Sequence, residues 1–256
     1  MHAYRNKSVI LPTALLCVVA FGSLAVLSDF QYLGTKIACW REDTSACTRL
    51  GSIYFSPAAY NLDKAEFYFR KADALNPNAT GILYYLGRIE FIRGDLNTSI
   101  FYMDRAIKID ADFEQAYYMR GLAEGYAGYF PQAIRDFQTY TSMAPDQWAG
   151  WNDLSFVYFK AGKFKEAEDT ARAGLEIFPD NPWLNNALGV ALLNQQKFQD
   201  AEAYLQAALA RFEQLTLTEW GSAYPGNNPI SYESGLLEAV ESVKVNLTLL
   251  ESTTAN

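Results

Sequence analysis

Few residues in this chain are of a type and spacing that could do chemistry. The one histidine, His2, stands in the N-terminal tail, which nearly excludes histidine-based triads and multi-histidine metal sites. Gly125-Tyr-Ala-Gly128 resembles a phosphate-binding loop only superficially, because neither Lys-Ser nor Lys-Thr follows it. Acidic pairs such as Glu166 with Glu168, or Asp110 with Asp112, are typical of solvated faces and helix ends. The sequence therefore predicts no catalytic residue, no metal site and no cofactor.

Cysteine offers the remaining reactive chemistry. Cys17 lies inside an apolar run, where cysteine behaves as a small hydrophobic residue. Cys39 and Cys47 are eight residues apart in a polar segment. They either form a local disulfide in an oxidising compartment or remain two free thiols, and spacing alone does not decide between these alternatives.

The composition narrows the class of partner. A net charge of -8 argues against nucleic acid, because a nucleic-acid partner would need a basic face. Aromatic residues are abundant, with 17 Tyr, 16 Phe and 5 Trp, and they suit helix packing or a peptide groove. We therefore expect a protein or peptide ligand.

The elements that position these side chains recur every 34 residues. Small residues form one row, a glycine row follows seven positions later, and alanine and proline rows mark the second half of each unit. These rows are Gly87, Gly121, Ser155 and Gly189; Gly94, Gly128, Gly162 and then Gln196; Ala65, Ser99, Ala133, Ala167 and Ala201; and Pro77, Ala111, Pro145 and Pro179. A fixed period of this size predicts stacked supersecondary units.

Each row has a physical reason. Small residues let two helices approach closely, and a left-handed glycine ends the first helix of each pair. Proline ends the second helix. Since one pair buries only part of its apolar surface, neighbouring pairs must stack to complete the core.

The same residues resemble the tetratricopeptide repeat (TPR) family, whose unit is a pair of antiparallel helices. Four units match clearly, at 80–113, 114–147, 148–181 and 182–215, through markers such as Leu86-Gly87, Tyr117 with Phe137, Trp151 with Tyr158, and Leu188-Gly189. A degenerate unit at 46–79 matches only in its second helix, because Ile53 stands where glycine is usual and Pro57 where a helix should continue. The resemblance implies an all-α, right-handed α-solenoid.

The family resemblance also implies a binding site. TPR proteins bind peptides on a concave face that is lined by fixed positions of each first helix. Carried onto this chain, these positions are Tyr84, Arg88, Phe91 and Ile92; Gln115, Tyr118, Leu122 and Tyr126; Asn152, Phe156, Phe159 and Lys160; and Trp183, Asn186, Val190 and Asn194. The lysines of the family's carboxylate clamp are absent. The alternative is that the aromatic residues pack against neighbouring repeats or against a C-terminal cap.

An apolar segment precedes the repeats. Residues 8–28 carry no charge and follow Arg5 and Lys7, so they predict a single-pass signal-anchor with the N-terminus cytoplasmic and the repeats on the extracytoplasmic, periplasmic or extracellular side. The alternative is a cleaved signal peptide. We expect four regions: the tail and transmembrane helix at 1–28, a neck at 29–55 with one short helix and both cysteines, the solenoid at 56–215, and a loop with a capping helix at 216–256.

These features favour a membrane-anchored scaffold that organises an envelope complex through its concave face. Two alternatives stay open. One is a periplasmic or secreted assembly factor with a cleaved signal, and the other is an accessory subunit of an envelope glycan enzyme. The last predicted helix, Tyr232 to Leu250, either seals the final repeat or binds a partner.

Overall fold

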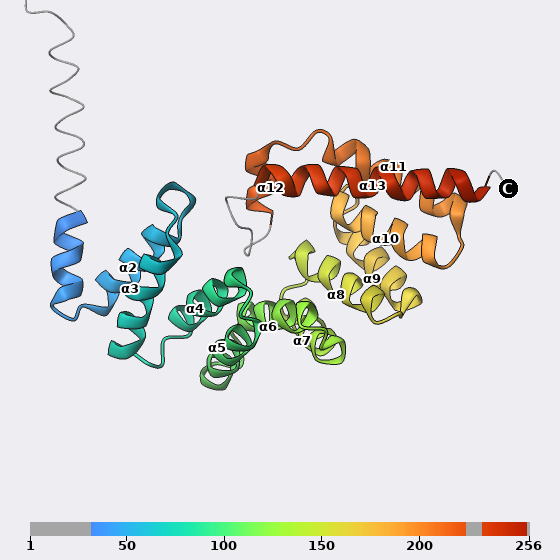
Figure 1. Ribbon diagram of the computed structural model, residues 1–256. Coiled ribbons are helices and arrows are strands. Elements are labelled where there is room, and N and C mark those ends of the chain that lie inside the picture. Colours follow the sequence, from blue (N-terminus) through green and yellow to red (C-terminus); the bar gives the residue numbers. More distant parts are fainter. Residues whose placement is uncertain (1–31, 224–231, 255–256) are drawn as a thin grey trace, which may run out of the picture.

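The computed structural model describes residues 32–223 and 232–254, and within them every regular element is helical. Ten helices form five antiparallel pairs that stack into a curved array (Figure 1). The pairs are α2 (Thr44–Phe55) with α3 (Leu62–Leu75), α4 (Thr80–Arg93) with α5 (Leu96–Ile109), α6 (Glu114–Tyr126) with α7 (Phe130–Met143), α8 (Trp148–Lys160) with α9 (Phe164–Ile177), and α10 (Pro182–Asn194) with α11 (Phe198–Phe212). The expected all-α solenoid-like fold is confirmed.

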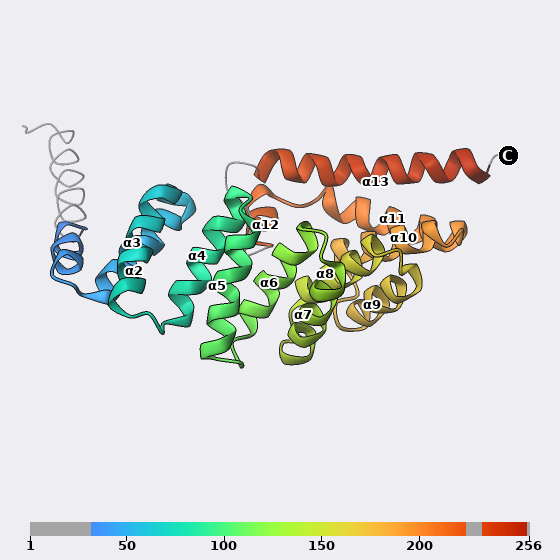
Figure 2. The same cartoon turned by 60° about the horizontal axis from the view of Figure 1, so that its bottom comes forward.

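Two further helices follow the pairs. The short α12 (Leu217–Ser222) and the long α13 (Tyr232–Thr254) lie on the inner side of the curve in Figure 1, and the turned view in Figure 2 shows α13 running along α11. Val243 and Leu250 of α13 are buried in the same cluster as Leu205 and Phe212 of α11. The predicted capping helix is thus present, and it closes the apolar side of the last pair.

The periodic small residues do what the pattern predicts. A Cβ atom added at Gly189 would lie 2.6 Å from Leu205 Cγ, so a larger residue would push α10 away from α11. Ser155 replaces glycine in the same row, and its hydroxyl donates to the carbonyl of Ala167 at 2.9 Å. The row therefore sets the close approach of the two helices in each pair.

Left-handed residues end four first helices. Gly94, Gly128 and Gly162 have φ of 84°, 82° and 75°, and Gln196 has φ of 61° at the corresponding position of the last pair. The predicted helix start at Asn61 is also confirmed, because its side chain accepts from Lys64 N at 2.9 Å.

The N-terminal neck contains more helix than expected. Residues 32–40 are helical, Glu42 turns the chain with φ of 67°, and Asp43 caps α2 by accepting from Ala46 N at 3.0 Å. The expectation of one short helix is therefore wrong. Pro57 lies beyond the end of α2, in the 3-10 turn Pro57–Ala59, so it does not interrupt that helix and the degenerate unit forms a full pair.

The predicted transmembrane helix, residues 8–28, lies outside the described part of the chain. Among the residues that are described, no helix is both long enough and apolar enough to cross a bilayer.

Candidate peptide-binding face

The first helices of the central pairs, α4, α6 and α8, line the inner side of the curve (Figure 1). Two rings there are open to solvent: Tyr126 is 69% exposed and Phe156 is 46% exposed. Phe91 meets Tyr126 edge-on at 5.5 Å between ring centroids, and Lys160 Nζ lies 6.0 Å from the centroid of the Phe156 ring. We call Phe91, Tyr126 and Phe156 the aromatic ledge.

Three polar side chains at predicted binding positions, Arg88, Gln115 and Asn186, lie on the first helices α4, α6 and α10. Arg88 stacks its guanidinium over the Phe55 ring at 4.6 Å and near Tyr84 at 5.5 Å, and no carboxylate among the described residues pairs with it. Its Nε atom is buried without a hydrogen-bond partner in the described part of the chain, and so are Gln115 Oε1 and Asn186 Oδ1. Buried polar atoms are normally paired, so these three stand out, but a ligand reaches them only if neighbouring side chains move.

Tyr118 departs from the prediction. It is only 2% exposed, and its hydroxyl donates to Asp153 Oδ2 at 2.7 Å, while Asn152 Nδ2 donates to Asp153 Oδ1 at 3.1 Å. Tyr118 therefore joins α6 to α8 beneath the inner face and does not present a ring to a ligand. Burial raises the pKa of Asp153 to about 7, although the two hydrogen bonds oppose that rise.

Trp183 is also not an open ligand contact. Its ring stacks on Trp148 at 4.5 Å and on Trp220 of α12 at 5.7 Å, and it meets Phe212 edge-on at 5.4 Å. We call Trp148, Trp183 and Trp220 the tryptophan stack. Here the alternative expectation holds, because the aromatic residue packs against the C-terminal cap.

The remaining predicted ring and aliphatic positions are half-buried. Leu122, Phe159 and Tyr84 pack against the main core, with Tyr84 meeting Phe113 at 5.9 Å and Phe159 meeting Phe164 at 5.5 Å. They support the face from below and leave the aromatic ledge as its exposed part.

Two contributors were not predicted. Phe55 flanks Arg88, and it was missed because the first repeat was expected to be degenerate. Trp220 was placed in a loop, yet the capping box of Thr216 and Glu219 starts α12 there. That Thr-x-x-Glu spacing was the available signal.

Two groups of carboxylates away from the inner face are bound in ion pairs. Arg120 bridges Asp136 and Asp104, at 2.6 Å to each. Glu168 was expected on a solvated face, but it is 4% exposed and pairs with Lys197 at 2.6 Å and Arg172 at 3.0 Å. Burial alone would raise its pKa, yet these hydrogen bonds lower it to about 2. Such groups tie helices together and are not arranged as acid and base around a cleft.

The cysteines are joined in the structure. Cys39 and Cys47 form a disulfide whose Cα atoms lie 4.7 Å apart. Elsewhere in residues 32–223 and 232–254, no group of three His, Cys, Asp or Glu side chains could hold a metal ion.

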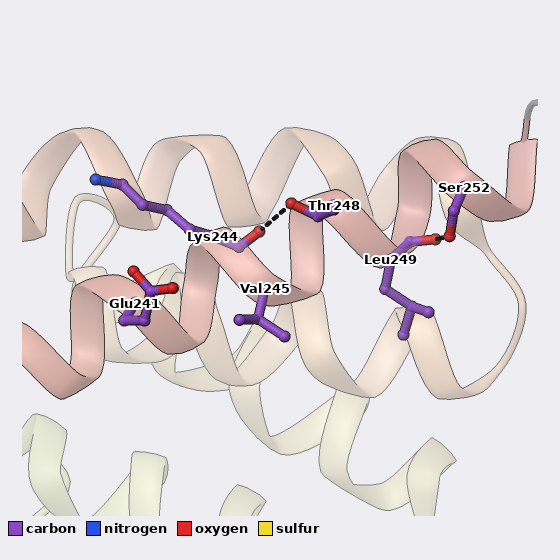
Figure 3. Close-up of a pocket in the computed structure, with 6 residues that line it drawn as sticks. All are labelled: Glu241, Lys244, Val245, Thr248, Leu249 and Ser252. Atoms are coloured by element: carbon purple, nitrogen blue, oxygen red, sulfur yellow. Dashed lines mark hydrogen bonds between the residues drawn. The ribbon is translucent and has the colours of Figure 1, made fainter.

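A shallow hollow on the outer face of α13 does not form a second site. All six lining residues come from this one helix, namely Glu241, Lys244, Val245, Thr248, Leu249 and Ser252 (Figure 3). The hydroxyls of Thr248 and Ser252 donate to carbonyls of their own helix, at 3.0 Å and 2.7 Å. The hollow therefore offers little that a ligand could recognise.

Comparison with known proteins identifies the repeats. Residues 118–182 and 186–216 match models of the tetratricopeptide repeat. Together with the five stacked helix pairs, these matches show that the chain belongs to the tetratricopeptide repeat family.

Individual relatives are distant. A protein named STIP1 homolog, from Dictyostelium discoideum, is 30% identical over 102 residues, which are 40% of this chain but only 18% of that relative's length. The crystal structure of MamA has a TM-score of 0.59 at 21% identity and covers 68% of this chain and 96% of its own. YrrB, described as a TPR protein with an unusual peptide-binding site, has a TM-score of 0.56 at 16% identity, covering 66% of this chain and 87% of its own. At these identities the two structures show the fold alone.

Proposed function

We propose that this chain is a membrane-anchored scaffold that binds an extended peptide or helix of a partner protein on the inner face of α4, α6 and α8. The observation that carries the proposal is the exposed aromatic ledge. Tyr126 and Phe156 offer apolar area to bury, and Arg88 of α4 and Gln115 of α6 add a buried donor and a buried acceptor on the same first helices. Peptide grooves combine buried rings with polar groups that pair the ligand backbone.

Two observations support the proposed location. Residues 8–28 are uncharged and long enough to span a bilayer, with basic residues before them. The disulfide between Cys39 and Cys47 suits an oxidising compartment such as the periplasm or the cell exterior. In this arrangement the repeats face outward and organise proteins of the envelope.

The binding face is tested by photo-crosslinking from position 126 in the native host, followed by affinity measurement with the crosslinked segment as a synthetic peptide. Tyr126→Ala with Phe156→Ala should weaken the peptide's affinity at least about tenfold, because two exposed rings lose their contacts. The matched control is Phe67→Ala with Phe101→Ala, since these rings are 63% and 56% exposed on the second helices α3 and α5. Equal affinity in all three proteins would sink the assignment of this face.

The anchor is tested separately. Mass spectrometry of the membrane fraction should find the intact N-terminus beginning at Met1. A mature protein that begins near residue 25 would instead support a periplasmic or secreted assembly factor. Co-purification of a catalytic envelope subunit would favour the accessory-subunit alternative.

A further inference from the structure

The helix at residues 32–40 has one side fixed to the repeats. Tyr32 meets Tyr54 of α2 edge-on at 6.0 Å, Ala38 packs against the core, and Cys39 is bonded to Cys47. In both views this helix stands at the N-terminal end of the array, beside the first pair (Figures 1 and 2). Its rotation is therefore set, and its other side faces away from the repeats.

That other side is apolar and open. Leu33, Ile37 and Trp40 follow at i, i+4 and i+7, so they share one helix face, and they are 51%, 45% and 83% exposed. Trp40 is the most exposed large apolar side chain in the described part of the chain. Lys36 and Arg41 line the same shallow hollow, so the face combines an aliphatic and indole strip with two cations.

We propose that this face, Leu33, Lys36, Ile37, Trp40 and Arg41, lies on the lipid surface of the membrane. The inference rests on the proposed anchoring by residues 8–28. Only four residues, Asp29 to Tyr32, separate the end of that apolar run from Leu33. Even fully extended, the five steps from Ser28 to Leu33 span at most about 18 Å, which keeps the helix at the membrane surface.

The chemistry of the face fits lipid headgroups. Tryptophan prefers the membrane–water interface, where its ring is partly buried and its N–H stays hydrated. Lys36 and Arg41 suit the phosphates of anionic lipids, which attract basic side chains near a membrane surface. Glu42 and Asp43 lie in the following turn, and Asp43 is engaged in capping α2.

A second protein surface fits less well. Stable protein interfaces bury at least about 1,200 Å² and need complementary shape. Three apolar side chains on nine residues of helix offer far less, whereas a lipid surface adapts to them. Docked in this way, the helix holds the repeats at a set orientation to the membrane, because the disulfide and the Tyr32–Tyr54 contact connect it to α2.

The test uses the full chain reconstituted into vesicles of phosphatidylcholine and phosphatidylglycerol whose acyl chains carry bromine near the headgroup. Bromine quenches only those of the five tryptophans that reach the lipid. The wild type should show a quenched component, and Trp40→Phe should lose it. Trp151→Phe is the matched control and should keep it, because Trp151 lies on α8 with its indole N–H bonded to the carbonyl of Pro145. Lys36→Gln with Arg41→Gln should reduce the quenching at least twofold.

Flotation of the same vesicles separates this proposal from the anchoring proposal. A chain that floats, but whose quenching is the same in Trp40→Phe as in wild type, overturns the lipid contact and leaves the anchor intact. A chain that does not float overturns both. If Trp40 becomes shielded from iodide in lipid-free detergent as protein concentration rises, the face binds a second copy, and the lipid proposal is wrong.

Discussion

The inner face of the curve is open over α6 and α8 and covered over α10. In the open part, Tyr126 and Phe156 face solvent above a buried carboxylate, Asp153, that binds Tyr118. In the covered part, Trp183 stands at a family ligand-binding position, yet it carries Trp220 of the chain's own α12. Family ligand-binding positions therefore have different tasks in neighbouring repeats.

This difference limits where a ligand can bind in the proposed function. The tryptophan stack covers the inner face of the last repeat, so that repeat attaches the cap and adds no open ring to the proposed binding surface. The central repeats keep their rings exposed. Beneath those rings, the hydrogen bond from Tyr118 of α6 to Asp153 of α8 joins the two helices. On this proposal, the rings that bind a ligand and the rings that stabilise the fold lie on different repeats of the same face.

The largest expected effect concerns the hydrogen bond between Tyr118 and Asp153, beneath the open part of the inner face. Because burial raises the pKa of Asp153 from 3.8 to about 7, the folded protein holds this proton more tightly than the unfolded chain between about pH 4 and pH 7. The free energy of unfolding should therefore fall as pH rises through that interval, by up to about 4 kcal/mol from this group. Asp153→Asn should remove that share of the fall, measured by urea denaturation at pH 4, 5.5 and 7.

Glu168→Gln is the opposite control. Its carboxyl has a pKa lowered to about 2, so its stabilising effect is present above about pH 4.5 and is lost as pH falls toward 2. This variant should lower the free energy of unfolding by a constant amount above about pH 4.5 and flatten the acid limb, while the slope between pH 4.5 and 7 stays that of the wild type. If the free energy of unfolding of Asp153→Asn falls as steeply as that of the wild type between pH 4 and 7, Asp153 is not a buried, protonated carboxyl.

The next effect concerns the covered part. Trp183→Ala should lower the free energy of unfolding by about 3 kcal/mol, because it removes a ring packed among Trp148, Phe212 and Trp220. Tyr126→Ala should cost less than about 1 kcal/mol, since that ring is 69% exposed. Urea titration followed by circular dichroism compares them. If both variants lose a similar free energy of unfolding, the covered and open parts of the inner face do not differ in their contribution to stability.

The periodic features were predictable from the sequence because they are local and repeat in one phase. Gly189 faces Leu205 within a single helix pair, and Gly94 ends its own helix, so 34-residue spacing was enough to place them. The burial of Tyr118 depends on Asp153, which comes 35 residues later on the next first helix. Nothing in the local pattern of α6 marks that partner.

The covering of Trp183 by α12 could not be predicted from the sequence for a similar reason. Trp183 is covered by Trp220 only because α12 returns to the inner side of the curve, and that return follows the end of the periodic pattern. The disulfide likewise depends on the turn at Glu42, whose positive φ brings Cys39 and Cys47 together, and spacing alone did not decide it. The 34-residue period thus could not predict contacts between segments that do not repeat.

The smallest expected effect compares the junctions that end the first helices in the two parts. Gln196 adopts φ of 61° after α10, where Gly128 adopts 82° after α6. A non-glycine residue in this conformation costs about 1 kcal/mol or more, so Gln196→Gly should raise the free energy of unfolding by up to about 1 kcal/mol. Gly128→Ala should lower it by a similar amount, and a Cβ atom there meets nothing within 4 Å, so the cost comes from the backbone alone. If Gln196→Gly destabilises the protein in the same urea titration, the Gln196 side chain supports the covered end, and the two junctions are not equivalent.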